Sequence, residues 1–505
     1  MFIPHSKIRF LTLLLSLGFV SAQAQTNFLN NPKVFNEIFE ALDTHGIEAF
    51  FTPAESVGAD VLWGKGYEGS GVIAGVWEAN ANVRIDPSDL NLQTSGVAPT
   101  RVTVKEGSVT FTHAQTVASV LAGDGTSADK GIAPKASLIS YNLDNNDYLT
   151  EMTTEAYPNG TGSDILVSNN SFAASAGWNG ANSGYWHGVL EVDEREDPKF
   201  GRYSDEEWIW DNIYDQTISD NPFLSIVKAA ANDNTHSGIT PYTQWTYDSG
   251  TDTFTRTPGT LIAPDKPEND GGTDGFDCIP YGAIGKNIIT VGACQNLMAP
   301  YTNKSQVVVQ PVSGFGPTDD GRIKPDLVAP SGNNTSYATP VVSGVVLLVQ
   351  EMYEDLIGPD YMQAATVKAL LCHTAHEADN DGPDYKTGWG MVNAAGAGTL
   401  IENNNRNILE ASLADGDSNL YYYYVPNAAT ETKVTLAWTD VEGTAAALTI
   451  TPADLNNTTA MLINDLDLRV IKLCDGTEFE PYILDPSNPA AAATTGDNFR
   501  DNIEQ

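Results

Sequence analysis

The sequence has few basic residues. Lysine and arginine number 26 among 505 residues, against 65 aspartates and glutamates, which gives a formal net charge of −39 at pH 7. A surface of this sign repels nucleic-acid phosphates and excludes nucleic acid as a partner. The many carboxylates are hard oxygen ligands that suit calcium, although solubility explains them equally well.

Cysteine is also scarce. The four cysteines are Cys278, Cys294, Cys372 and Cys474, and no Cys-x-x-Cys motif occurs. This number excludes a dense disulfide framework, and the spacing argues against a structural zinc site. Cys278 and Cys294 are close in the sequence, so we expect this pair to form a disulfide if the protein is exported.

Apolar runs long enough to span a bilayer are missing. The chain begins with Lys7 and Arg9, an apolar stretch at 10–20 and small residues at 22–24. This order is typical of an export signal, predicted over residues 1–25, and a membrane anchor is the alternative. We therefore expect a soluble protein outside the cytoplasm, secreted or periplasmic, with no membrane partner.

After a short N-terminal extension (26–60), strand-like and helix-like segments alternate up to residue 408. We expect strands at 72–77, 137–141, 165–167, 224–231 and 287–293, and helices at 31–45, 113–122, 339–353 and 364–374. Such alternation predicts an α/β domain over 61–408, with a doubly wound, mostly parallel sheet. The stretch 152–221 is rich in Trp, Tyr and acidic residues, and we expect it to form surface loops.

Near residue 409 the pattern changes. Strands are expected at 421–425, 433–438, 466–472 and 478–484, separated by turn residues and without helices. This predicts a smaller antiparallel β domain over 409–505, a truncated barrel or jelly roll. An incomplete barrel would leave an open sheet edge, which is an aggregation liability.

A serine stands where a long apolar helix is predicted to begin. Ser336 lies four residues before Pro340, a residue that fits a first helical turn. A serine in this position has an exposed hydroxyl beside backbone N–H groups that attract negative charge. Taken alone, Ser336 or its neighbour Thr335 is better explained as a helix cap, because caps outnumber nucleophiles.

Two further polar residues occupy comparable places. His113 opens the predicted helix THAQTVASVLAG, and Asn232 follows a buried strand in VKAAANDN, where its amide could donate to an oxyanion. Each also has a plain structural explanation, as a core histidine and as a turn residue.

Together these segments resemble the subtilisin-like (subtilase) serine peptidases, from about Val61 to Ala397. The family's His-Gly-Thr-His-Val-Ala-Gly helix is similar to residues 113–119, its Ala-Ala-Gly-Asn segment to 229–232, and its Gly-Thr-Ser-Met-Ala-Thr-Pro motif to 334–340. GSGVIAGVWEAN resembles the strand that ends in the triad acid, and FGPTDDGRIKPDLVAP, NIITVGA and GPDYKTGWGMVNA resemble core segments. TLAWTD, LINDLDLRV and GDNFRDNIEQ resemble the C-terminal β-barrel of a bacterial subgroup.

The resemblance implies catalytic roles. Ser336 would be the nucleophile and His113 the general base, with Glu78 at the position of the third triad member, where the family norm is Asp. Asn232 and the backbone N–H of Ser336 would hold the oxyanion.

The resemblance also implies how substrate binds. Ser171, Phe172 and Ala173 would pair with the backbone of a protein or peptide substrate as an added strand. The chemistry would need no metal or other cofactor, although structural calcium is common in the family. A monomer is the default for a secreted hydrolase of this kind.

Three departures from the family pattern keep a second hypothesis open. Glu78 is one methylene longer than Asp, so Asp86 and Asp89 are alternative triad acids. The His113 helix carries Ala114 and Thr116 in place of Gly and His, and the stretch between residues 330 and 336 is short. The alternative to an active endopeptidase is therefore a catalytically silent subtilase fold used as a binding or surface module. A glycosidase with paired carboxylates has only the abundance of acids in its favour.

Overall fold

A computed structural model describes residues 51–505, except 81, 95–96, 127–129, 144–151, 153, 155–163, 182, 191, 194, 218–221, 249–252, 260–274, 404–406, 426–431 and 446–454. The predicted signal peptide and the predicted helix at 31–45 lie outside the described residues. Among the residues described, no helix is both long enough and apolar enough to cross a membrane.

A seven-stranded sheet forms the centre of the protein, in the order β14-β13-β10-β8-β1-β7-β5. All neighbouring strands in it are parallel. Their bounds are β1 Ile73–Glu78, β5 Val102–Val104, β7 Ser137–Asn142, β8 Val167–Asn170, β10 Ser225–Ala229, β13 Ile289–Cys294 and β14 Leu327–Pro330. The predicted α/β class and parallel sheet are confirmed, with strand ends shifted by at most three residues.

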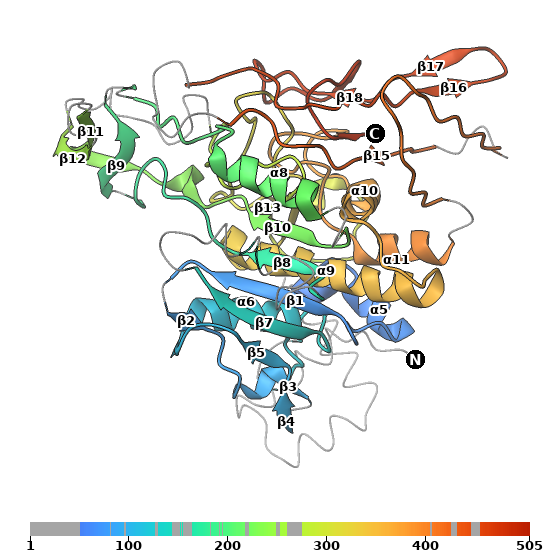
Figure 1. Ribbon diagram of the computed structural model, residues 1–505, viewed down its shortest axis with the longest axis horizontal. Coiled ribbons are helices and arrows are strands. Elements are labelled where there is room, and N and C mark those ends of the chain that lie inside the picture. Colours follow the sequence, from blue (N-terminus) through green and yellow to red (C-terminus); the bar gives the residue numbers. More distant parts are fainter. Residues whose placement is uncertain are drawn as a thin grey trace, which may run out of the picture.

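Helices cover both faces of this sheet (Figure 1). Their bounds are α4 Pro53–Ser56, α5 Ala59–Lys65, α6 Thr112–Ala122, α8 Asp205–Thr217, α9 Thr335–Leu356, α10 Ala364–Thr374 and α11 Ala394–Glu402, with short 3-10 turns at η1 Leu90–Leu92, η2 Asp233–Thr235 and η3 Lys304–Gln306. Alternate residues of a strand point to opposite faces. Val227 accordingly joins the core around α9, while Ile226 joins the cluster that contains Trp210 of α8.

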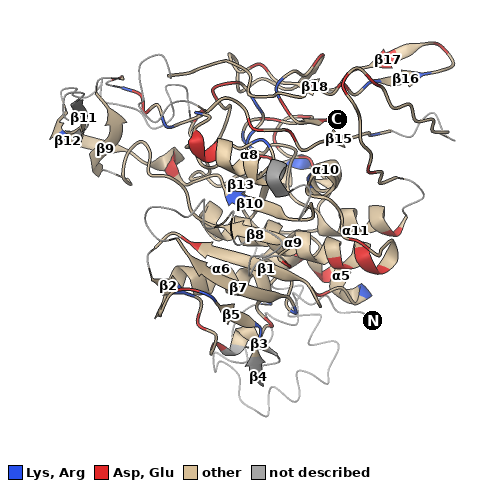
Figure 2. Ribbon diagram, in the orientation of Figure 1, with Lys and Arg blue, Asp and Glu red and all other residues tan. Residues whose placement is uncertain are grey.

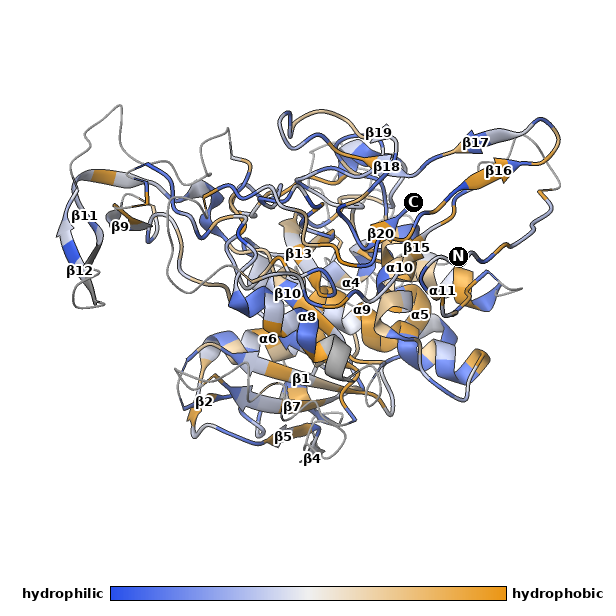
Figure 3. Cartoon of the chain, turned by 45° about the horizontal axis from the view of Figure 1, so that its top comes forward, coloured by the Kyte–Doolittle hydropathy of each residue, from blue (hydrophilic) through white to orange (hydrophobic). Residues whose placement is uncertain are grey.

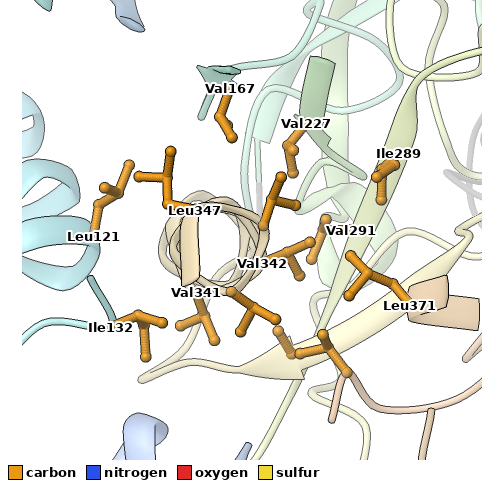
Figure 4. Close-up of a cluster of buried hydrophobic side chains, with 14 of the residues drawn as sticks. Leu121, Ile132, Val167, Val227, Ile289, Val291, Val341, Val342, Leu347 and Leu371 are labelled. Atoms are coloured by element: carbon orange, nitrogen blue, oxygen red, sulfur yellow. The ribbon is translucent and has the colours of Figure 1, made fainter. Parts of the chain in front are cut away.

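The core centres on α9. Figure 4 looks along this helix, with Val341, Val342 and Leu347 surrounded by side chains of the sheet and of neighbouring helices. Sixteen of its 22 residues are buried. A helix that is apolar on nearly every side must be enclosed, which is why it fixes the position of the residues at its N-terminus.

The expectation of loops over 152–221 is wrong in two places. Strand β9 (Ser183–Val189) pairs with β11 (Gly238–Asp248), which pairs with β12 (Thr253–Pro258). Helix α8 begins with three acidic residues, visible in Figure 2, and buries Trp210 and Ile213 against the sheet. The many Tyr, Trp and acidic residues conceal this amphipathic helix in the sequence.

The remaining strands are short. They are β2 Val83–Arg84, β3 Gln93–Thr94, β4 Val97–Thr100, β6 Val109–Thr110, β15 Leu436–Ala437, β16 Val470–Lys472, β17 Thr477–Phe479, β18 Tyr482–Ile483, β19 Thr494–Thr495 and β20 Ile503–Glu504. Beyond residue 409 they form separate antiparallel pairs, and the described residues contain no closed barrel. Figure 3 shows the hydrophobic β16 in a hairpin that projects from the core.

One strand predicted in this region is wrong. Residues 421–425 are exposed and join no sheet within the described part of the chain; Tyr424 is 88% exposed. A run of aromatic residues favours a strand only where a partner strand and an apolar face are available.

Candidate active site

The candidate residues meet at one edge of the central sheet. Glu78 is the last residue of β1, Ser171 follows β8, and Asn232 comes shortly after β10. Parallel strands end at the same edge, so side chains far apart in the sequence converge there. Helix α9 begins at Thr335 and brings Ser336 to this edge.

Glu78 and His113 form a close pair. His113 Nδ1 lies 2.8 Å from Glu78 Oε2 and 3.0 Å from Oε1. The Glu78 side chain is 3% exposed and that of His113 28% exposed. An ionised carboxylate can only accept, so it favours the tautomer with the proton on Nδ1 and leaves Nε2 as the basic nitrogen. This is the arrangement that a triad acid imposes on its histidine.

Neither alternative acid lies against His113. Asp86 accepts hydrogen bonds from the backbone and side chain of Ser88. Asp89 accepts from the side chain of Gln115 at 2.7 Å. Both carboxylates therefore stabilise the loop after β1 and the helix α6, and Glu78 is the acid that contacts the histidine.

Ser336 lies in the first turn of α9. Asn334 caps this helix by accepting from the backbone N–H of Tyr337 at 3.2 Å. The residue Ser336 is only 8% exposed. Within the described residues no hydrogen bond joins Ser336 to His113, whose ring centroid lies 5.7 Å from that of the neighbouring Tyr337. Catalytic hydrogen bonds are often longer without substrate than in the substrate complex.

Asn232 lies directly beside the start of α9. Its Oδ1 accepts from the backbone N–H of Thr335 at 2.8 Å and faces the Thr335 hydroxyl at 3.2 Å. These contacts fix the orientation of the amide next to Ser336. In the described structure the Asn232 amide nitrogen makes no hydrogen bond, so it is available as a donor.

The backbone just before Asn232 is strained. Ala231 has φ of 70°, in the left-handed region, where the similar family segment has glycine. An L-residue with a Cβ costs roughly 1–2 kcal/mol in this conformation. The turn brings Asn232 out of the β10 direction toward α9, and Gly314 N–H donates to the Ala231 carbonyl at 3.3 Å.

Residues 171–173 follow β8 at the same edge. Ser171 Oγ accepts from Asn169, whose amide oxygen accepts from Ser343 of α9 at 2.9 Å. The segment is thus linked to helix α9 through buried side chains.

Lys228 is a residue of this site that the sequence analysis missed. Its Nζ donates to the Phe172 carbonyl at 2.6 Å and lies 3.3 Å from the centroid of the Phe172 ring. The side chain is buried, and this burial lowers its pKa to about 7, partly offset by Glu206 and Glu207. A lysine inside the apolar run SIVKAAA was the available signal.

The expected disulfide is absent. All four cysteines are free thiols, and Cys278 and Cys294 are buried in different clusters. Cys278 Sγ accepts from the backbone N–H of Phe315, while Cys294 ends β13. The two cysteines are close in the sequence, but β13 carries Cys294 away from Cys278 into a different hydrophobic cluster. The described residues also hold no group of three or more His, Cys, Asp or Glu side chains suited to a metal ion.

Comparisons with known proteins agree with this picture. The family model described as "Subtilase family" matches residues 101–390. The chain is 25% identical over 222 residues to the Serine protease/ABC transporter B family protein tagA of Dictyostelium discoideum, covering 34% of this chain and 12% of that protein. The chain thus spans about an eighth of this relative's length.

Two of the solved structures that resemble this chain are proteases. The Clostridium perfringens CspB protease has a TM-score of 0.45 and 15% identity, covering 70% of this chain and 100% of that one. The prenylagaramide maturation protease PagA has a TM-score of 0.41 and 16% identity, covering 68% and 98%.

Proposed function

Because the chain belongs to the subtilase family of serine peptidases, we propose that it is a secreted serine endopeptidase with Ser336, His113 and Glu78 as its triad. The observation that carries the proposal is the close pairing of a buried carboxylate with His113 Nδ1. A histidine whose Nε2 is left basic and a serine at a helix N-terminus, both at one edge of the sheet, are the groups that nucleophilic catalysis by serine requires.

In the proposed reaction, Ser336 Oγ attacks the scissile carbonyl carbon and its proton passes to His113 Nε2. Glu78 stabilises the imidazolium, and the Asn232 amide with the Ser336 backbone N–H stabilises the oxyanion. The C–N bond then breaks, with the proton delivered to the leaving amine. Water hydrolyses the acyl-enzyme by the same route and restores Ser336. His113 must come within hydrogen-bond reach of Ser336 as substrate binds.

Ser171, Phe172 and Ala173 would pair with the substrate backbone beside the nucleophile. We further propose that the protein is a monomer that acts on a broad range of proteins or peptides without a cofactor. Residues 1–25 would direct its export. N-terminal sequencing of the exported protein should find a start near residue 26; an unprocessed N-terminus would overturn the export signal.

The deciding test is labelling of the purified protein with a serine-reactive fluorophosphonate. We expect labelling of the wild type and none of Ser336→Ala, because only an activated serine reacts at a useful rate. Ser305→Ala is the control, since Ser305 is an exposed serine whose hydroxyl donates to Asn303 outside the site, and it should leave labelling intact.

The second candidate is a silent binding module with a subtilase fold. The missing hydrogen bond between His113 and Ser336 is the observation in its favour. Folded protein that takes up no fluorophosphonate, with or without calcium, would establish this candidate and reject the endopeptidase.

A further inference from the structure

The small sheet β9-β11-β12 begins at the two segments that would hold substrate. Strand β9 follows residues 171–173 along the chain, and β11 follows Asn232. The starts of these two strands are joined, because Ser183 N–H donates to the Ser237 carbonyl at 2.7 Å. In Figure 1 this sheet stands at the left, outside the layers of the central domain. A polypeptide longer than the residues paired at the scissile bond can therefore reach it.

One face of this sheet is fixed by a buried aromatic cluster. Trp178, Trp186 and Tyr242 pack together with ring centroids 5.0 and 5.2 Å apart. Neighbouring residues of a strand point to opposite faces, so Tyr185 and Trp245 lie on the other face. Tyr185 is 54% exposed there. The sheet is thus anchored on one side and open to solvent on the other.

The open face holds an arginine between aromatic rings and the backbone. Arg256 of β12 pairs in register with Trp245 of β11. Its guanidinium carbon lies 4.4 Å from the Trp245 ring centroid and 5.2 Å from that of Tyr185. Its Nη1 donates to the carbonyls of Trp186 at 3.0 Å and Thr243 at 3.3 Å. These contacts fix the plane of the guanidinium before any ligand arrives.

The other edge of the guanidinium has no partner in the described part of the chain. Neither Nε nor Nη2 of Arg256 makes a hydrogen bond there, and no Asp or Glu forms an ion pair with it. By contrast, Lys199, which donates to the His187 carbonyl of β9 at 2.8 Å, has Asp197 at 3.4 Å. Although the chain has 65 acidic residues, the described ones leave the Arg256 cation unpaired.

We propose that Arg256, with Trp245 and Tyr185, forms an exosite that binds an acidic side chain of the polypeptide substrate. The proposal rests on the proposed endopeptidase for the identity of that polypeptide. Nε and Nη2 form the fork that accepts both oxygens of one carboxylate, and a stacked guanidinium loses little freedom on binding.

Charge limits which polypeptides fit. The net charge of −39 repels strongly acidic chains, so the occupant that fits is a Glu or Asp within an otherwise neutral segment. The exposed Tyr185 ring offers an apolar surface to the residues beside that carboxylate. Arg256 would therefore select among substrates without touching the scissile bond.

The experiment is binding of two fluorescein-labelled unstructured peptides to the full mature chain carrying Ser336→Ala, so that neither peptide is cleaved. One peptide contains several Glu residues in a neutral sequence, and the other has Gln at each of these positions. Fluorescence anisotropy at physiological ionic strength should show about 10-fold tighter binding of the Glu peptide, because a charged bidentate contact is lost with Gln. Adding Arg256→Met should abolish this difference.

Arg500→Met is the matched control. Arg500 is also stacked on an exposed aromatic ring, with its guanidinium carbon 4.7 Å from the Phe499 centroid, and it lies in the C-terminal part of the chain. It should keep the full preference for Glu over Gln. If Arg256→Met fails to fold, as judged by circular dichroism, Arg256→Lys replaces it and should lose most of the preference, because an ammonium lacks the planar fork.

Equal binding of the two peptides, no measurable binding of the Glu peptide, or a preference that survives Arg256→Met would each overturn the exosite. A lower Tm for Arg256→Met with an unchanged Glu preference would show that the stacked arginine only supports the sheet. Fluorophosphonate labelling of wild type tests the endopeptidase separately, since that probe carries no peptide segment. Absence of labelling with a preference that depends on Arg256 would reject the endopeptidase and leave a binding site for acidic polypeptides.

Discussion

At the residue scale, Glu78 is longer by one methylene than the aspartate common in its family. The backbone at Glu78 is fixed by strand pairing, so it cannot move toward His113 to compensate for a shorter side chain. Strand β1 pairs with β7 at Glu78 itself and with β8 at the preceding Trp77. The extra reach is what brings the carboxylate to 2.8 Å from His113 Nδ1. Restoring the family's residue should therefore harm this protein.

We predict that Glu78→Asp slows fluorophosphonate labelling about 100-fold, because the carboxylate withdraws by an ångström or more. Glu78→Gln should slow it by about 10⁴-fold, because an amide can stabilise neither the tautomer nor the imidazolium. The rate of fluorophosphonate labelling, measured over a range of pH for each variant, checks both predictions. Asp86→Asn is the control and should be labelled as fast as wild type. An Asp variant as fast as wild type would show that the length of Glu78 is unimportant.

Part of this site could be predicted from the sequence. Glu78, His113, Asn232 and Ser336 lie in motifs whose local form is fixed by a strand end or a helix start. The strain at Ala231 and the contact of Lys228 with the Phe172 carbonyl could not be predicted, because both depend on contacts between distant segments.

At the element scale, Lys228 connects β10 to the segment that follows β8. Its amine donates to the Phe172 carbonyl, and its pKa is lowered from 10.5 to about 7 by burial. Between pH 7 and 10.5 the folded protein therefore holds fewer protons on Lys228 than the unfolded chain does. Its contribution to stability accordingly rises with pH across this window and is least favourable below pH 7.

We predict that Lys228→Met gains stability relative to wild type at pH 6 and loses this advantage as the pH rises toward 10. The variant should also show a KM for peptide substrates raised about 10-fold, with a smaller change in kcat, because residues 171–173 lose a hydrogen bond that orients them. Urea unfolding at several pH values and steady-state kinetics check both. Lys472→Met changes an exposed lysine and should alter neither the pH dependence of stability nor KM. A stability difference between Lys228→Met and wild type that does not change with pH would contradict the argument.

Prediction of the elements succeeded where burial on both sides leaves a plain signal. The strands of the parallel sheet are short apolar runs, and α9 and α10 have clear helical spacing. Helix α8 was missed because its buried Trp210 and Ile213 stand among acidic and aromatic residues that also suit loops. The strand expected at 421–425 failed for the opposite reason, since its apolar residues find no surface to cover.

At the scale of the whole molecule, the C-terminal part is joined to the central domain by buried polar groups. Lys286 Nζ lies 2.5 Å from Asp440 Oδ2, both side chains are 0% exposed, and Lys286 also donates to the Met461 carbonyl at 2.8 Å. Asn287 exchanges two hydrogen bonds with the backbone of Asp440. Leu484 and Ile503 even belong to the main hydrophobic core. Near residue 409 the predicted pattern changes from alternating strands and helices to strands alone. This change does not indicate which residues on its two sides contact each other.

This junction leads to a prediction about cooperativity. Asp440→Leu should destabilise the protein by about 3–5 kcal/mol, because it leaves the buried ammonium of Lys286 without its counter-charge. Lys286→Met with Asp440→Leu should cost clearly less than the sum of the two single changes, since no uncompensated charge remains. Urea unfolding of the four proteins measures the coupling, and Lys304→Met with Asp381→Asn, an exposed pair, should show little. Additive losses at the buried pair, or wild-type unfolding of residues 409–505 in a separate earlier transition, would mean that these contacts do not hold the two parts together.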